Sequence, residues 1–197
     1  MKNTIALLAL ISIGFGCVNR SNPMLSVNPK CISLNNKGHD YLVQFEMSNK
    51  NTDLRDSAQF YLTLSSECDS AFITPIYNLS TLHFHDEQYD ICLRYLKLIE
   101  QKSAYADPFL LAMQAVCLKH LSRIQEFDRI RTAAVFSSIA ELHQQKEYYQ
   151  FIKTIQIIQM TYGNSIAEKF YLNEKNNIKN LPNNFSIEEL LSKDSIQ

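Results

Sequence analysis

Tryptophan is absent from this chain of 197 residues, and glycine and proline are scarce, with four and five residues respectively. β-Sandwiches and barrels depend on many turns that contain glycine or proline, so this scarcity favours an all-α fold. An excess of one charge sign is lacking as well, because the formal net charge is −1 and no basic stripe runs along the sequence. Nucleic-acid-binding domains usually carry such a stripe. We therefore predict a helical protein without a nucleic-acid partner.

Catalytic signatures are also lacking. The sequence has no G-x-S-x-G elbow, no glycine-rich phosphate loop and no cysteine within a protease motif. One short segment, HFHDE at 83–87, gathers residue types that bind metals. On a helix His83 and Glu87 share a face while His85 points elsewhere, whereas zinc needs three or four converging ligands. We therefore expect no enzyme, no cofactor, no metal site and no small-molecule substrate.

The N-terminus has the pattern of an export signal. A short cationic start, MKN, precedes an almost wholly apolar run at 4–15, which is too short to span a membrane core that needs about 20 residues. A glycine and then Cys17 follow this run. The pattern resembles the bacterial lipobox, which implies removal of residues 1–16 and lipid attachment at Cys17. Gly14 and Phe15 depart from the usual lipobox, so ordinary secretion with cleavage at the same point stays open.

The segment after the cysteine reads as a linker. Residues 18–38 contain two prolines and five asparagines, with turn chemistry at both Asn-Pro pairs. We predict a flexible tether over 17–38 that connects the lipidated cysteine to the folded domain. The folded domain is then expected to begin at residue 39.

An internal repeat follows. The segment 56–64 (DSAQFYLTL) recurs as 90–98 (DICLRYLKL) at an offset of 34, with four of nine positions identical and Ala58 matched by another small residue, Cys92. This period, with a small residue in the second helix, resembles the tetratricopeptide repeat. The resemblance implies a short α-solenoid of antiparallel helix pairs with its first two repeats at 39–72 and 73–106.

The pattern becomes less regular beyond the second repeat. Proline at the first helical position predicts a helix from Asp107-Pro108. Residues 126–130 resemble the start of the second helix of repeat two, at an offset of 38. Gly163 is a predicted C-cap. We assign 39–163 to the helical-repeat domain. Capping boxes at Ser165 and Ser186 flank an asparagine-rich stretch, which predicts a capping helix and a polar, weakly ordered tail over 164–197.

Four cysteines follow Cys17. Cys92 and Cys117 fall on apolar helix faces, which is typical of small buried hydrophobic residues. Cys31 precedes the first helix and Cys68 ends the second helix of the same antiparallel pair. Because an exported protein folds in an oxidising compartment, a Cys31–Cys68 disulfide is a prediction that stays open.

The resemblance also implies a function. In tetratricopeptide repeats the first helices line a concave groove that grips peptides or partner helices. The predicted function is therefore a non-catalytic scaffold that binds another envelope protein or peptide. It would be anchored by lipid at the outer membrane on the periplasmic side. Open alternatives are a secreted or soluble periplasmic protein, an immunity lipoprotein that neutralises a toxin, and, from another class, a cell-wall or glycan-processing enzyme. By position in the repeat, the groove residues are Val43, Met47, Lys50, Tyr77, Thr81 and His85.

Overall fold

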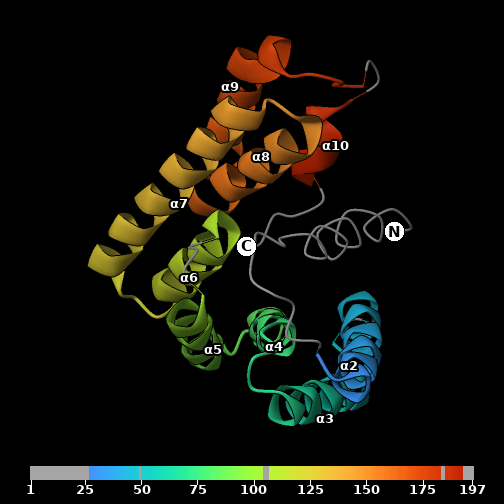
Figure 1. The fold of residues 1–197 in the computed structure, drawn as a ribbon. Helices are drawn as coiled ribbons and strands as arrows, with labels where there is room; N and C mark the ends of the chain where they lie inside the picture. The colour runs from blue at the N-terminus through green and yellow to red at the C-terminus, as the bar shows by residue number, and fades with distance from the viewer. Residues whose placement is uncertain (1–26, 49, 104–106, 183–184, 193–197) are drawn as a thin grey trace. The chain divides into compact units, whose positions relative to one another are not determined.

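The computed structural model describes residues 27–48, 50–103, 107–182 and 185–192 (Figure 1). This part of the chain is all-α and contains no strand; an isolated bridge joins Glu147 and Lys179. The all-α prediction is therefore confirmed. The predicted signal peptide and Cys17 lie outside the described residues. The contacts divide the chain into unit 1, up to Lys102, and unit 2, from Ser103, and this division falls inside the region predicted as one repeat domain.

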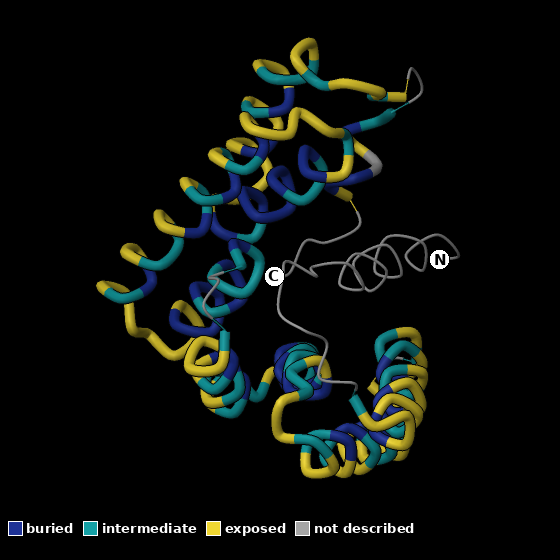
Figure 2. Tube along the Cα trace, viewed as in Figure 1, coloured by how far each residue is buried: buried dark blue, intermediate teal, exposed yellow. Residues whose placement is uncertain are grey.

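Unit 1 consists of two helical hairpins. The first is α2 (Pro29–Met47) with α3 (Thr52–Cys68), and the second is α4 (Thr74–His85) with α5 (Tyr89–Lys102). Each helix packs on the next, and α2 also contacts α4. Buried residues run along one side of each helix (Figure 2). The hairpins therefore lie against each other mainly through α3 and α4, with a smaller contact between α2 and α4.

The boundary predicted at residue 39 is wrong, because α2 begins ten residues earlier at Pro29. The Asn28 side chain caps this helix by accepting a hydrogen bond from the Lys30 amide at 2.9 Å, and proline suits the first helical position. One face of α2 is buried from its first turn onwards. Residues 29–38 of the tether predicted over 17–38 are thus the first half of a packed helix.

Two pairs of positions that match at an offset of 34 are buried in both hairpins. Ala58 and Cys92 are both completely buried, and so is Leu62, while Leu96 is nearly so. Small side chains at these two positions let the helices of a hairpin approach closely. On the facing helix the closest approach is made by Gly38, because a Cβ added there would stand 2.6 Å from Cγ of Leu62.

A third hairpin, α6 (Pro108–His120) with α7 (Ile124–Gln145), begins unit 2. Its turn repeats the turn between α4 and α5: Glu87 and Ser122 both have left-handed backbones, with φ of 60° and 58°. In both turns the next amide reaches five residues back at 2.9 Å, a helix-ending pattern of hydrogen bonds. These two turns are therefore 35 residues apart, three fewer than the offset of 38 at which residues 126–130 match.

The rest of unit 2 is α8 (Tyr148–Tyr162), α9 (Asn164–Glu174), the short 3₁₀ helix η2 (Lys175–Asn177) and α10 (Ile187–Ser192). The helix start predicted at Asp107-Pro108 is confirmed, and the Asp107 side chain caps α6 by accepting a hydrogen bond from the Phe109 amide at 2.7 Å. Gly163 ends α8 with φ of 87°, as predicted. The core of unit 2 lies between α6, α7 and α8 around Ala112, Ala134 and Ile157.

The tail is more ordered than predicted. The side chains of Ile187, Leu190 and Leu191 in α10 are buried, and the Gln159 amide donates a hydrogen bond to the Leu191 carbonyl at 3.1 Å. The capping box at Ser165 is wrong, because α9 begins at Asn164 and has no side-chain cap. Short apolar segments such as α10 become helical through docking on a neighbour rather than through their own propensity.

Candidate partner-binding surface

The six predicted groove residues all lie on or next to the first helices of unit 1. Val43 and Met47 belong to α2, and Tyr77, Thr81 and His85 belong to α4, while Lys50 lies in the turn after α2. Because α2 and α4 contact each other, the structure brings these residues to neighbouring helices. They differ, however, in what their side chains contact.

Two of the six make polar contacts between the hairpins. The Lys50 ammonium pairs with the Glu87 carboxylate, which joins the turn of the first hairpin to the turn of the second. The His85 Nε2 lies 3.2 Å from the Glu46 carboxylate of α2. Both side chains therefore contribute first of all to holding the hairpins together.

The charge state of His85 follows from its surroundings. Burial, together with a smaller effect of the nearby positive charge of Lys50, lowers the pKa of His85 to about 4. His85 is therefore neutral at pH 7, and with its proton on Nε2 it donates a hydrogen bond to Glu46. The neutral imidazole of His85 thus links α4 to α2 through a hydrogen bond and presents no positive charge to a ligand.

His83 has a different environment from His85. Its Nδ1 contacts the Gln88 side chain at 2.9 Å, and its ring stacks on Tyr95 at 5.4 Å between centroids. Burial lowers the pKa of His83 as well. The two histidines of the HFHDE segment thus turn to different partners. Across the described ranges, no cluster of three or more histidine, cysteine, aspartate or glutamate side chains could hold a metal ion.

Sequence reasoning missed a polar chain that joins α3 to the turn between α4 and α5. The Arg55 guanidinium lies 3.4 Å from the Asp86 carboxylate, which also accepts a hydrogen bond from Gln88 at 2.7 Å. Gln88 then reaches His83. In the repeat pattern Arg55 stands where the second repeat has a tyrosine, and that departure was the one available signal of a different role.

The remaining predicted residues form an accessible apolar strip. Met47 is 53% exposed, and Val43, Tyr77 and Thr81 are partly exposed. The α2 and α4 helices that carry them are joined by a further contact, in which the Asn78 amide donates to the Asn35 oxygen at 3.0 Å. This strip is defined by Val43, Met47, Tyr77 and Thr81, and we refer to it as the α2/α4 strip.

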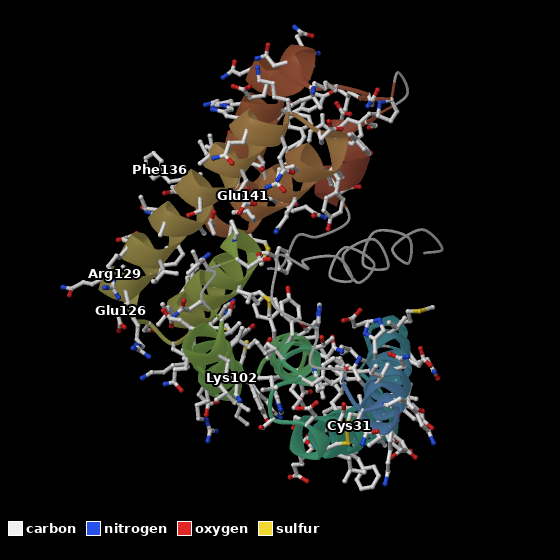
Figure 3. The ribbon with its side chains drawn as sticks, viewed as in Figure 1. Cys31, Lys102, Glu126, Arg129, Phe136 and Glu141 are labelled. Carbon is white, nitrogen blue, oxygen red and sulfur yellow. A yellow bond between two sulfur atoms is a disulfide. The ribbon has the colours of Figure 1, made fainter. Side chains whose placement is uncertain are left out.

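The structure shows other accessible features that sequence reasoning did not single out. On α3, Phe60 is 57% exposed and Leu64 is 36% exposed. They line a shallow hollow together with Asp56, Gln59 and Thr63. On α7, Phe136 is 71% exposed and projects away from the helix (Figure 3). A second hollow, in unit 2, is lined by Leu142, His143, Lys146, Glu174, Asn177 and Ile178.

The cysteines follow the predicted pairing. Cys31 and Cys68 form a disulfide with their Cα atoms 5.6 Å apart, and it joins the start of α2 to the end of α3 (Figure 3). Cys92 and Cys117 are free thiols and are buried, as expected for small core residues.

No helix in the described ranges is long and apolar enough to cross a membrane. Comparison with known proteins adds no relative, because no protein family, no curated protein and no solved structure matches this chain.

Proposed function

We propose that this chain is a non-catalytic, protein-binding scaffold of the bacterial cell envelope. In this proposal it is a short α-solenoid similar to tetratricopeptide repeats, and a lipid on Cys17 holds it at the outer membrane on the periplasmic side. The observation that carries the proposal is the α2/α4 strip, in which Met47 is 53% exposed on a helix fixed to its neighbour. The partner is another envelope protein or peptide.

The contacts between the hairpins support this role. The contact between His85 and Glu46 and the hydrogen bond from Asn78 to Asn35 hold α2 against α4 before a partner arrives, and the exposed pair Lys50–Glu87 adds a weaker link between the two turns. A surface that is ordered in advance loses less conformational entropy on binding, so more of the contact energy appears as affinity. Methionine and tyrosine suit such a surface because methionine adapts its shape and tyrosine offers a large rigid contact area.

The first prediction concerns the α2/α4 strip. A photo-crosslinking amino acid at position 47 should capture one defined envelope protein in living cells. The same amino acid at Ile124 of α7, which is also 53% exposed, should not capture it. Tyr77→Ala should then weaken binding of the purified partner about 30-fold or more, since interface hot spots lose about 2 kcal/mol on truncation.

The measurement for Tyr77→Ala is a titration of the identified partner, with circular dichroism as the check on folding. Helix content equal to that of the original chain, together with unchanged affinity, would contradict the assignment of Tyr77 to the binding strip. Equal crosslinking from positions 47 and 124 would contradict the assignment of the α2/α4 strip as a whole.

The second prediction concerns the anchor. Cys17→Ala removes the sulfur that would carry the lipid, so the chain should move from the detergent-extracted membrane fraction to the soluble periplasmic fraction. Metabolic labelling with a fatty acid should mark the original chain and not the variant. A variant that stays with the membrane, or an original chain that takes up no label, would show that Cys17 is not the anchor.

A further inference from the structure

An aromatic cluster covers one side of the first hairpin. The rings of Tyr41 and Tyr61 stack with centroids 5.7 Å apart, and Phe60 meets Tyr61 edge-on at 5.2 Å. The Lys37 ammonium lies 4.2 Å from the centre of the Tyr61 ring. With Leu64, these residues define a surface that we call the aromatic face, formed by Lys37, Tyr41, Phe60, Tyr61 and Leu64.

The aromatic face lies on the side of the hairpin away from α4. On α2 the residues that bond to α4 are Asn35 and Glu46. Successive helical residues are about 100° apart, so Lys37 lies roughly 160° around the helix from Asn35. Tyr41 is similarly far around the helix from Glu46. The aromatic face therefore stands where a preceding hairpin would pack if the stack continued.

The composition of this end is unusual for a terminal repeat. End repeats normally present a polar outer surface, because an apolar one promotes association. Here Phe60 is 57% exposed and Leu64 is 36% exposed, next to the partly exposed rings of Tyr41 and Tyr61. Tyrosine and phenylalanine are enriched in the cores of protein interfaces, which are surrounded by polar residues.

The charges at one end of the aromatic face indicate what covers it. Lys30 immediately precedes Cys31 on α2, and Glu67 immediately precedes Cys68 on α3. Because Cys31 and Cys68 are bonded, Lys30 and Glu67 stand at the same level on neighbouring helices. Both side chains are exposed. The end of the face is thus positive along α2 and negative along α3.

A second copy of the same chain matches this arrangement. A two-fold axis parallel to the helices lays α2 of one copy over α3 of the other and keeps the levels unchanged. Each Lys30 then faces Glu67 of the other copy, while Phe60 and Leu64 of α3 lie over α2 of the other copy. Self-complementary patches of this kind are the hallmark of two-fold homodimers. A partner of one charge sign would match only one of the two edges.

We propose that the aromatic face is a homodimer interface through which two copies of this chain pair about a two-fold axis parallel to α2 and α3. The proposal is independent of the α2/α4 strip, which lies on the other side of α2. A dimer would therefore present two copies of that strip to partners.

Phe60→Ser tests this proposal. Sedimentation of the full chain in density-matched detergent should show a monomer–dimer equilibrium, and Phe60→Ser should raise its dissociation constant about 30-fold or more. Phe136→Ser on α7 is the matched control, because Phe136 is even more exposed at 71% and lies outside the aromatic face. Equal helix content by circular dichroism in both variants makes the comparison valid.

Charge reversal tests the orientation of the two copies. Lys30→Glu and Glu67→Lys should each weaken dimerisation, because they bring like charges together twice, and the double variant should restore it. A bis-maleimide reagent that spans neighbouring helices should crosslink Leu64→Cys into a dimer, while it should not crosslink Arg94→Cys on the exposed surface of α5.

Three results would overturn the proposal. The first is a chain that stays monomeric across the micromolar range. The second is an equal loss of dimer in Phe60→Ser and Phe136→Ser. The third is a monomer whose retention on phospholipid vesicles falls with Phe60→Ser, which would make the aromatic face a membrane contact.

Discussion

Removal of the Cys31–Cys68 disulfide is expected to lower the free energy of unfolding by about 4 kcal/mol. The two cysteines are 37 residues apart, and closing a loop of this length in the unfolded chain costs roughly that much entropy. The bond also joins the two ends of the first hairpin where Cys31 is completely buried. The nearby Ser65 hydroxyl donates a hydrogen bond to the Cys31 carbonyl at 2.7 Å, so the start of α2 is fixed twice.

The measurement is urea unfolding followed by circular dichroism, comparing the chain with its Cys31→Ala/Cys68→Ala variant. Hydrogen exchange should become faster at the amides of α2 and α3. A reductant should shift the unfolding midpoint of the original chain but not that of the variant, whose remaining buried thiols, Cys92 and Cys117, form no disulfide. An original chain whose midpoint is insensitive to reductant would contradict the expected contribution.

The sequence predicted the core better than the ends of the elements. The match between 56–64 and 90–98 indicated that Ala58 and Cys92 are packed inside their hairpins, and both are completely buried. That prediction worked because a buried position in a repeat shows the same kind of side chain in both copies, so the sequence indicates its burial twice. Helix starts have no such duplication. The start of α2 was missed because asparagine, proline and glycine are typical of linkers.

Tertiary contacts explain why those linker-like residues are helical. Asn35 is buried against Asn78 of α4, and Gly38 packs against Leu62 of α3. Neither contact is visible to a pattern confined to neighbouring residues, and such contacts routinely override intrinsic helix propensity. The tail shows the same effect, because Leu190 and Leu191 are buried where the local sequence predicted weak order.

The candidate site was predicted at the level of helices but not at the level of side-chain contacts. A repeat register places Lys50 and His85 near the first helices, and they lie there. Their partners, Glu87 and Glu46, come from segments about 40 residues away in the sequence, and no register predicts which acid reaches which base. Conversely, the sequence did not single out Phe60. Its position departs only slightly from the spacing of core residues on a helix, so its exposure follows only from the way α2 packs on α3.

Gly38→Ala adds only one methyl group, yet it is expected to destabilise the first hairpin strongly. A Cβ at position 38 would stand 2.8 Å from Cδ2 of Leu62 and 2.9 Å from the backbone nitrogen of the same residue. The side-chain atoms could turn aside, but the backbone nitrogen can move only with the whole of α3. Alanine normally stabilises a helix by about 1 kcal/mol relative to glycine, so propensity alone would predict the opposite sign.

We expect the overpacking to prevail and Gly38→Ala to lower the free energy of unfolding by about 1–3 kcal/mol. The measurement is chemical unfolding followed by circular dichroism, with the disulfide intact in every variant. Asn36→Ala is the matched control, because Asn36 is an exposed residue of the same helix and should become slightly more stable through helix propensity alone. If both variants gained stability, α2 and α3 would not approach each other at Gly38 as closely as the structure shows, and the packing of the first hairpin would need a different register.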